Sequence, residues 1–318
     1  MRTPLPVGTH LTLSAIGTQQ QITVQIQELI GTGASCLVYT AVCRDGEQNE
    51  FYLRLKEFCP ENLHLIRQQD GSLLAADEEA FQRQMQSFIW GYQKQMQFRQ
   101  FPESCNSISN VQGVFTGNGT RYIAMNCQNS IPLEQQELSL YDTFRVLRAV
   151  AQQLDNLHQH GYLYLDLKPA NVLLYPETPE LVMLFDFDSA VEKSRLSDAV
   201  ISCTAKWAAP EVLQQNRRKI GVASDVYTLG GLLLYLLFRR VPEVKDRRNR
   251  AVWDAEFPDS VLAGTSPEIR RMVTELLRKT LSANPEKRYA SCAELLAQIE
   301  PFLDSFRQPK PYLQTKLP

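Results

Sequence analysis

The sequence predicts an α+β fold with two unlike lobes, a small sheet lobe followed by a larger helical lobe. Three observations lead to this prediction. The chain has 318 residues, which is longer than one typical domain. Its first third alternates short strand-like runs with turns, whereas the remainder shows the three- and four-residue apolar spacing of helices. We place the boundary near residues 126–132. The predicted parts are an N-terminal extension (1–22), an N-lobe (23–127), a C-lobe (128–306) and a tail (307–318).

The predicted sheet lobe consists of consecutive antiparallel hairpins and one helix. Apolar and β-branched runs bounded by turn residues predict strands at 22–30, 37–43, 51–58, 111–115 and 121–125. A polar turn with Asp-Gly joins the second and third strands, and a Gly-Asn-Gly turn joins the last two. A long Gln-rich stretch at 78–98 predicts the helix, and residues 61–76 before it form an irregular polar insert.

The C-terminal lobe is predicted to be mainly helical. Between residues 144 and 157 apolar side chains recur at steps of three and four, the stripe of an amphipathic helix, and Gly161 is placed to cap it. Further helices are predicted at 222–238, 267–281 and 291–306. The Pro- and Lys-containing tail has little apolar surface to bury, so we expect it to be a disordered spacer.

Composition narrows the range of partners and compartments. The net charge is -2, so no overall field attracts nucleic acid or an anionic membrane, and we expect neither as a partner. The longest apolar stretch is about ten residues, roughly half of a bilayer span. The start of the chain lacks the pattern of a signal peptide. Seven scattered cysteines without a Cys-x-x-Cys pair predict reduced thiols rather than a zinc site, so we expect a cytoplasmic protein.

The most informative segment is residues 164–171, Tyr-Leu-Asp-Leu-Lys-Pro-Ala-Asn, which precedes a short apolar run. It resembles the catalytic loop of protein kinases. Phosphoryl transfer needs a carboxylate to orient the attacking hydroxyl and ligands that hold magnesium against the phosphates. The resemblance implies that Asp166 is the catalytic base and Asn171 a metal ligand. It also implies that Lys168 neutralises charge on the γ-phosphate, and a lysine at this offset resembles Ser/Thr-directed kinases.

A second motif follows fifteen residues after Asn171, where Asp186 ends an apolar run in Leu-Phe-Asp-Phe-Asp. The run resembles the kinase metal-binding motif, in which aspartate, phenylalanine and glycine follow a strand. The resemblance implies that Asp186 is the main magnesium ligand. Asp188 stands in the place of the glycine. Either a peptide flip that needs glycine becomes less accessible, or Asp188 contributes a further oxygen near the metal.

Residues 31–38, Gly-Thr-Gly-Ala-Ser-Cys-Leu-Val, resemble the kinase glycine-rich loop, with Cys36 in place of the third glycine. Glycines allow backbone amides to approach phosphates closely. The resemblance therefore implies that Gly31 and Gly33 lie against the phosphates of ATP and that Val38 packs on the adenine.

Two more residues are assigned to ATP. Lys56 follows an apolar neighbour in a predicted strand, as does the strand lysine of kinases, and is expected to bind the α- and β-phosphates. Asn126, at the boundary between the lobes, is also placed among the ATP-binding residues.

Residues 203–211, ending in Ala-Ala-Pro-Glu, resemble the end of a kinase activation segment. Thr204 is expected to hydrogen-bond near the catalytic base and its lysine. Glu211 is expected to form a buried structural ion pair with Arg288. Asp225 resembles the helix aspartate that supports the catalytic loop, although by itself it could equally be a helix cap.

These motifs occur between residues 31 and 303 in the order found in the eukaryotic-like Ser/Thr protein kinase family, and the pattern is most similar to bacterial members. The resemblance implies a bilobal protein-kinase-like fold, with a five-stranded lobe and one helix stacked on a larger helical lobe and ATP between them. It implies transfer of the γ-phosphoryl group of ATP to Ser or Thr hydroxyls of a protein substrate, with Mg²⁺ or Mn²⁺.

The sequence also departs from the family pattern. The His-Arg pair that usually precedes the base is Tyr164-Leu165, so we expect activity independent of activation-segment phosphorylation. Alignment of 88–98 with the family helix places Gly91 where a glutamate should pair with the strand lysine. Glu78 and Glu79 are the alternative partners if the insert is shorter.

Two alternative functions remain at this point. The departures suggest a pseudokinase that acts as a nucleotide-binding scaffold or regulator. A small-molecule phosphotransferase would share the base, the asparagine and the metal aspartate, but such enzymes generally lack the Lys168 position and the Ala-Pro-Glu segment found here.

Overall fold

The computed structural model describes residues 2–44, 50–98, 110–126, 130–175, 177–179, 181–243, 246 and 251–307. Within these ranges the side chains of 110–112, 126, 251–252 and 305–307 lie outside the description. The chain divides into two compact units. The first consists of Met1–Ser130 with Phe185–Asp188, and the second of Ile131–Leu184 with Ser189–Pro318.

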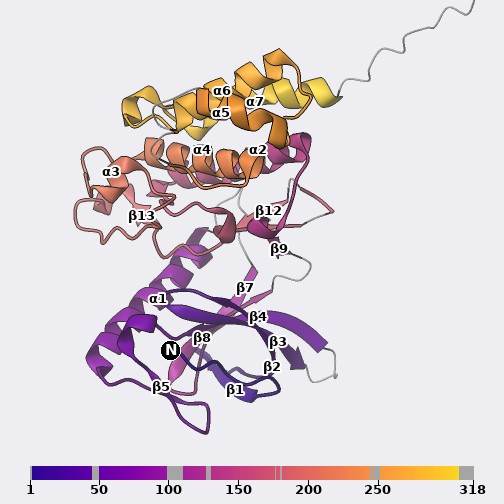
Figure 1. The fold of residues 1–318 in the computed structure, drawn as a ribbon. Coiled ribbons are helices and arrows are strands. Elements are labelled where there is room, and N and C mark those ends of the chain that lie inside the picture. The colour runs from indigo at the N-terminus through magenta and orange to yellow at the C-terminus, as the bar shows by residue number, and fades with distance from the viewer. Residues whose placement is uncertain are drawn as a thin grey trace, which may run out of the picture. The chain divides into compact units, whose positions relative to one another are not determined.

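The first unit is built around a closed antiparallel barrel with the strand order β1-β2-β3-β4-β8-β7 (Figure 1). The strands are β1 (His10–Ala15), β2 (Gln21–Thr32), β3 (Cys36–Arg44), β4 (Glu50–Phe58), β7 (Asn110–Gly117) and β8 (Thr120–Asn126). All but β1 lie where the sequence predicted strands. β3 and β4 pair without interruption from Cys36↔Phe58 to Arg44↔Glu50, so this hairpin has a single register.

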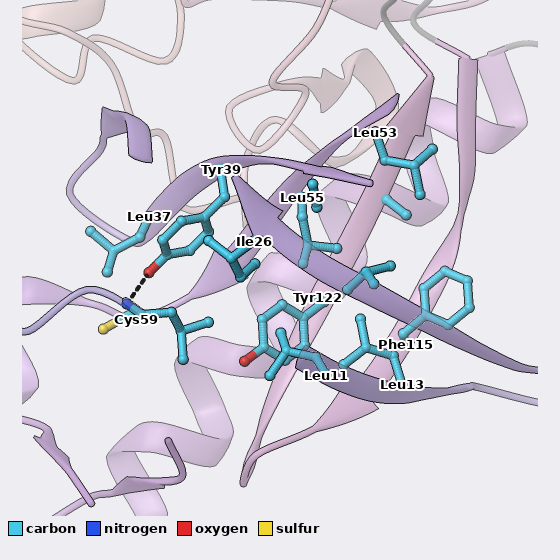
Figure 2. Close-up of a cluster of buried hydrophobic side chains, with 14 of the residues drawn as sticks. Leu11, Leu13, Ile26, Leu37, Tyr39, Leu53, Leu55, Cys59, Phe115 and Tyr122 are labelled. Atoms are coloured by element: carbon cyan, nitrogen blue, oxygen red, sulfur yellow. Dashed lines mark hydrogen bonds between the residues drawn. The ribbon is translucent and has the colours of Figure 1, made fainter. Parts of the chain in front are cut away.

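Side chains of each strand alternate between the interior of the barrel and its outer face, because successive Cβ atoms point to opposite sides. In β4, Leu53 and Leu55 belong to the barrel core, and Glu57 at the next inward position is fully buried. Figure 2 shows this core, in which aliphatic side chains from several strands surround Tyr39 and Tyr122. The alternation directs Lys56 to the outer face.

The N-terminal residues differ from the expectation of an extension at 1–22. β1 pairs with β2 and, at Ser14 and Ala15, with β7, which closes the barrel. Leu11 and Leu13 are buried in its core. The barrel therefore has six strands rather than the five implied by the family resemblance. Closure is favourable because it leaves neither β2 nor β7 as an unpaired edge.

The helix of the first unit, α1, spans Glu78–Phe98, as predicted. Phe81, Met85 and Phe88 lie on its buried face. The rings of Phe81 and Phe88 lie 5.2 and 5.3 Å from the ring of Phe58 at the end of β4. These contacts hold the helix against the strand that carries Lys56.

The polar insert before α1 is more regular than expected. It contains a 3-10 turn, η1 (Glu61–Leu63), and a small hairpin of β5 (Ile66–Arg67) and β6 (Leu73–Leu74). Leu73 is buried in the barrel core, so the insert packs on the barrel.

The second unit is mainly helical, as predicted. Its helices are α2 (Leu140–Gln159), α3 (Pro210–Leu213), α4 (Val222–Phe238), α5 (Ala251–Glu256), α6 (Pro267–Thr280) and α7 (Cys292–Arg307). α4 is mostly apolar and almost entirely buried, and it packs against both α2 and α6, while α2 also packs on α7. Gly161 follows α2 with a φ of 85°, the left-handed conformation for which the sequence assigned it a capping role.

Short strands and turns carry the loops of the second unit. The strands are β9 (Ile131–Pro132), β10 (Tyr162–Leu163), β11 (Val172–Leu174), β12 (Val182–Leu184) and β13 (Val191–Glu192). The 3-10 turns are η2 (Leu133–Gln135), η3 (Pro169–Asn171), η4 (Lys193–Arg195), η6 (Phe257–Asp259) and η7 (Pro285–Lys287). Among the described residues, no helix is long and apolar enough to span a bilayer.

Candidate active site

The loop between β10 and β11 is held in place by hydrogen bonds to α4. The fully buried carboxylate of Asp225 accepts hydrogen bonds from the backbone N–H groups of Tyr164 at 2.9 Å and Leu165 at 2.7 Å. It also lies 2.8 Å from the Nε2 atom of His158. Leu165 has a φ of 65°, which is unusual for a residue with a branched side chain. Asp225 thus stabilises a strained backbone directly before Asp166, which agrees with the supporting role expected of it.

Asp166 is the centre of a hydrogen-bonded group in the second unit. Its Oδ2 atom lies 2.8 Å from the Nζ atom of Lys168, and its Oδ1 atom accepts the backbone N–H of Thr204 at 2.8 Å. Lys168 also donates to the Thr204 hydroxyl at 2.7 Å. Asn171 donates from Nδ2 to the backbone oxygen of Asp166 at 2.9 Å and to its Oδ2 at 3.2 Å. The second unit therefore brings Thr204 of the predicted activation segment together with the three residues assigned to the catalytic loop.

The carboxamide of Asn171 has a defined orientation because it is buried and its Nδ2 atom donates to Asp166. The Oδ1 atom is directed away from that contact. An amide oxygen is a suitable ligand for a hard cation such as Mg²⁺. The position and chemistry of Asn171 therefore fit the metal-binding role predicted from the sequence.

Lys56 and Asp186 form an ion pair within the first unit, with 3.3 Å between Nζ and Oδ1. Lys56 projects from β4, and Asp186 follows β12 with a left-handed φ of 63°. Burial opposes the charge of Lys56, but the carboxylates of Asp186 and Asp188 outweigh this effect and raise its pKa above the ordinary value. Lys56 therefore stays protonated, as binding to phosphate requires.

The predicted glycine-rich loop is the hairpin turn between β2 and β3. Gly33 donates its backbone N–H to the oxygen of Cys36 at 2.9 Å. A Cβ atom at Gly31 would lie 3.8 Å from Val38, and one at Gly33 would lie 3.5 Å from the Sγ of Cys36, which are ordinary contacts. Packing among the described residues therefore does not require glycine here. Residues without bulky side chains allow a ligand to approach the backbone of this turn closely.

Val38 lies directly opposite Lys56 in the pairing of β3 with β4, so both side chains lie on the same outer face of the barrel. This neighbourhood is consistent with the two predicted ATP contacts. The side chain of Asn126, the remaining predicted ATP contact, lies outside the described residues.

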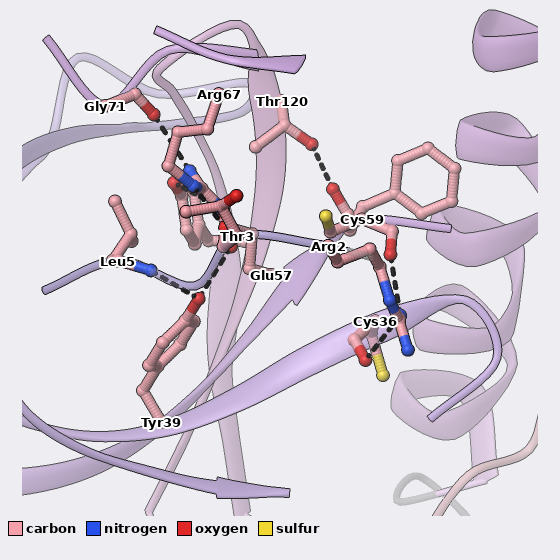
Figure 3. A network of polar contacts seen from close by, with 12 residues as sticks. Arg2, Thr3, Leu5, Cys36, Tyr39, Glu57, Cys59, Arg67, Gly71 and Thr120 are labelled. Carbon is pink, nitrogen blue, oxygen red and sulfur yellow. Dashed lines mark hydrogen bonds and ion pairs between the residues drawn. The ribbon is translucent and has the colours of Figure 1, made fainter. Parts of the chain in front are cut away.

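Arg2 contacts the base of the glycine-rich loop, which the sequence did not reveal. Its Nη1 atom donates to the backbone oxygen of Gly33 at 2.7 Å. It also donates to the backbone oxygens of Cys36 at 3.2 Å and Cys59 at 2.8 Å (Figure 3). One guanidinium thus links the hairpin turn to the residue that follows β4. No local pattern in the first residues signals this contact, because it depends on the path of the chain.

Glu57, the neighbour of Lys56, lies at the centre of a buried network. Both oxygens accept hydrogen bonds from Arg67, at 2.7 and 3.1 Å, and the hydroxyls of Tyr39 and Tyr122 donate at 3.0 and 2.8 Å. Figure 3 shows the hairpin of the insert bringing Arg67 to this carboxylate. Burial and the charge of Glu57 raise the pKa of Tyr39, so its hydroxyl remains a donor. The network stabilises β4 next to the site.

Glu211 and Arg288 form the expected buried pair, with two contacts of 2.6 and 2.9 Å. Their side chains are 2% and 0% exposed. Ser224 donates a further hydrogen bond to Glu211 at 2.7 Å. Burial alone would raise the pKa of Glu211, but Arg288 outweighs it, and the pKa lies below its ordinary value.

The structure supports the alignment that places Gly91 in the position of the helix glutamate. The Nζ atom of Lys56 lies 5.6 Å from the ring centre of Phe88, one turn before Gly91. Glu78 and Glu79 lie in the first turn of α1, and Glu79 pairs with Arg83 at 2.7 Å. Among the ion pairs of the described residues, that of Lys56 is with Asp186 rather than with a carboxylate of α1.

A barrel with one helix, together with a helical unit that carries an Asp-Lys-Asn loop, is the arrangement typical of protein kinases. The family model "Protein kinase domain" matches residues 93–299, well over half of the chain. The chain therefore belongs to the protein kinase domain family. The matched range begins after the glycine-rich loop and Lys56. For those residues the similarity to protein kinases therefore rests on the fold.

Several curated Ser/Thr kinases are similar in sequence. The probable serine/threonine-protein kinase pknA2 of Bifidobacterium longum is 28% identical over 219 residues, covering 64% of this chain and 28% of the relative. The serine/threonine-protein kinase PknB of Mycolicibacterium smegmatis is 29% identical over 162 residues, covering 48% of this chain and 25% of the relative. The alignments thus cover only about a quarter of the length of these relatives.

Among solved structures, the kinase domain of PknI from Mycobacterium tuberculosis has a TM-score of 0.57 at 21% identity, with 94% of this chain and 99% of that chain covered. A second crystal structure of the same domain gives 0.55 at 22% identity, with 93% and 98% covered. These likenesses show that the fold is a bilobal kinase fold.

Proposed function

We propose that the chain transfers the γ-phosphoryl group of ATP to Ser or Thr hydroxyls of a protein substrate. The observation that carries this proposal is the group formed by Asp166, Lys168, Asn171 and Thr204, since it places a carboxylate, a cation and an amide oxygen around one loop. Three hydrogen-bond donors orient the carboxylate before any substrate binds. Such preorganisation is what phosphoryl transfer requires of a protein.

Each residue has a defined part in the proposed reaction. Asp166 accepts the proton of the attacking hydroxyl and orients it, and Lys168 stabilises charge on the γ-phosphoryl group during transfer. Lys56 binds the α- and β-phosphates. The amides near Gly31 and Gly33 cover the phosphates, and Val38 and Asn126 contact the base.

Asp186 and Asn171 would hold the divalent cation that protein kinases use, and we propose Mg²⁺ or Mn²⁺. Among the described residues, no group of three or more His, Cys, Asp or Glu side chains is arranged to hold a metal by itself. Magnesium typically takes one or two protein carboxylates and completes its shell with phosphate oxygens and water. A carboxylate and an amide oxygen fit that requirement. When bound, the cation neutralises charge on the phosphates.

We further propose that the activity does not depend on a phosphate in the activation segment. Leu165 stands where an arginine would bind such a phosphate, and its backbone is instead secured by Asp225 at 2.7 Å. Lys168 and Thr204 already contact Asp166 without a modified residue. The loop conformation is thus maintained by the unmodified chain.

The test is transfer of labelled γ-phosphate from ATP, with magnesium and separately with manganese, to the protein itself and to a generic basic protein. We expect label on Ser or Thr that disappears in Asp166→Ala and persists in Asp259→Ala, an exposed aspartate of the same unit. Absence of label, combined with thermal stabilisation by ATP, would instead identify a nucleotide-binding scaffold. Label confined to small-molecule hydroxyls would identify a small-molecule phosphotransferase.

A further inference from the structure

Two of the departures from the family pattern meet in space within the first unit. Gly91 of α1 stands where the family has a glutamate, and Asp188 stands where the family has a glycine. A Cβ atom built on Gly91 would lie 2.9 Å from the Cγ of Asp188, 3.3 Å from its Cα and closer still to its Oδ1. The carboxylate of Asp188 therefore occupies the space that a side chain at position 91 would need.

The helix holds the segment Phe185–Asp188 at neighbouring positions. Three residues after Gly91, the Nζ atom of Lys94 donates to the backbone oxygens of Asp188 at 3.3 Å and Phe187 at 3.5 Å. The ring of Phe98 lies 5.1 Å from that of Phe187. These contacts fix the backbone that carries Asp188, so the approach of its carboxylate to Gly91 is part of a packed interface.

Lys56 lies against the same face of α1. Its Nζ atom lies 5.6 Å from the ring centre of Phe88, one helical turn before Gly91, and pairs with Asp186, two residues before Asp188. The other candidates on α1 are not available for this role. The side chain of Glu79 is 83% exposed and pairs with Arg83, and Glu78 accepts a hydrogen bond from Gln82.

We propose that Asp188 replaces the missing helix glutamate as a positioning residue for Lys56, and that Gly91 is the reciprocal change that makes room for it. The negative charge has moved from the helix to the segment after β12, while the helix position has lost its side chain. The inference rests on the proposed function in one respect, namely that Lys56 binds the phosphates of the nucleotide.

A double-mutant cycle tests the exchange directly. Asp188→Gly removes the carboxylate, and Gly91→Glu introduces a side chain that collides with Asp188. We expect each single variant to weaken ADP and ATP affinity by roughly 2- to 150-fold, the range of interaction energies between residues in contact. The double variant, which restores the usual family arrangement, should bind nucleotide more tightly than either single variant. The proposal is overturned if the double variant binds nucleotide no more tightly than the single variant with the lower affinity.

A smaller substitution tests the steric part if the glutamate variant does not fold. Asp188→Gly removes the contacts of the carboxylate and leaves only the 3.3 Å approach to the backbone, and alanine forms helices better than glycine. Gly91→Ala should therefore lower the melting temperature in the wild-type background, because its Cβ meets the carboxylate of Asp188, and should lower it less, or raise it, in the Asp188→Gly background. An equal decrease in both backgrounds would contradict the reciprocal exchange.

Nucleotide binding without metal separates this role from metal ligation by Asp188. We expect Asp188→Asn to weaken ADP binding in EDTA, and to have no further effect in a Lys56→Met background, because the carboxylate acts through the lysine. Glu79→Gln is the matched control and should bind normally. An effect of Asp188→Asn that appears only with Mg²⁺, as a higher magnesium requirement, would show that Asp188 is a metal ligand and overturn the proposal.

These outcomes are distinct from failure of the proposed function. Phosphate transfer by the wild type and its loss in Asp166→Ala test the reaction, whereas the cycle is read from binding and melting of variants at positions 91 and 188. An inactive wild type with an intact cycle would leave the positioning role of Asp188 in place as part of a nucleotide-binding site.

Discussion

Leu165 and Asp186 share a left-handed backbone conformation, although neither is glycine. Leu165 directly precedes Asp166, the proposed catalytic base, and Asp186 is itself a proposed metal ligand. Leu165 is held by the buried Asp225, and Asp186 pairs with Lys56. Strained residues persist where surrounding contacts determine their conformation, and they concentrate at functional sites. These contacts offset the backbone strain at Leu165 and Asp186 and thereby orient the carboxylates of Asp166 and Asp186.

The base itself gives the first prediction. Asp166→Asn keeps the size of the side chain and an acceptor for the Thr204 N–H, but removes the group that accepts a proton. We expect kcat to fall by about 10²- to 10⁴-fold, the usual contribution of general-base catalysis, with little change in melting temperature. Steady-state kinetics with a generic basic protein measure the effect. A decrease of less than about tenfold would argue against Asp166 as the base.

The support of the loop gives the second prediction. Asp225→Ala leaves the N–H groups of Tyr164 and Leu165 without their buried acceptor, at a cost of about 1–3 kcal/mol for each unsatisfied group. We expect lower stability and a lower kcat with nearly unchanged KM for ATP, since the ATP-binding residues of the first unit are untouched. Denaturant unfolding and ATP titration check this. A rise in KM alone would contradict a loop-positioning role.

The short strand β1 completes the barrel of the first unit. It contributes Leu11 and Leu13 to the barrel core and pairs with both β2 and β7. β1 also stabilises β4, the strand that carries Lys56, because the inward side chains of both strands pack in the same core. Closure turns a sheet with two edges into a barrel with none.

Leu13 therefore provides an element-scale prediction. It is 0% exposed, and Leu13→Ala should reduce the free energy of unfolding by about 2–5 kcal/mol through lost burial and a cavity. Ile16→Ala, at a position 48% exposed just after β1, is the matched control and should change it by less than about 0.5 kcal/mol. Hydrogen exchange should locate the loss of protection in the barrel strands. Equal effects of the two variants would mean that β1 is not part of the barrel core.

Over the whole molecule, buried pairs of opposite charges hold separate elements together within each unit. Glu57 and Arg67 do so in the first unit, and Glu211 and Arg288, separated by 77 residues in sequence, do so in the second. Breaking a buried pair by removing one partner commonly costs about 3–5 kcal/mol, because the other charge stays buried. The net charge of -2 contributes little by comparison.

The pH dependence of stability gives the last prediction. The pKa of Glu211 is below its ordinary value of 4.5, so its contribution is fully present above that pH and is lost as the pH falls through the lowered pKa. In Arg288→Met, burial without a partner favours the neutral acid. The variant should therefore be less stable by about 3–5 kcal/mol near neutral pH, and the difference should shrink in acid. Melting curves of both proteins between neutral and acidic pH measure it, and a constant difference would contradict the assignment.

Local patterns were sufficient to predict most helices and strands. The strands β2, β3, β4, β7 and β8, the helix α1 and the main helices of the second unit follow from periodicity and turn residues, because these patterns are written in neighbouring positions. Glu211 pairs with Arg288 as expected from the motif order. By contrast, β1 was interpreted as an extension, although Leu11 and Leu13 alternate with polar residues.

The contacts that could not be predicted depend on the path of the chain and not on a local pattern. Arg2 reaches the glycine-rich loop and Arg67 reaches Glu57 only because the chain passes over the barrel, and no spacing rule describes such a path. The sequence alone identified Gly91 and Asp188 as two separate departures. Their meeting in space depends on how α1 packs against the segment after β12, since the room for a side chain is a property of the packed structure and not of either residue alone.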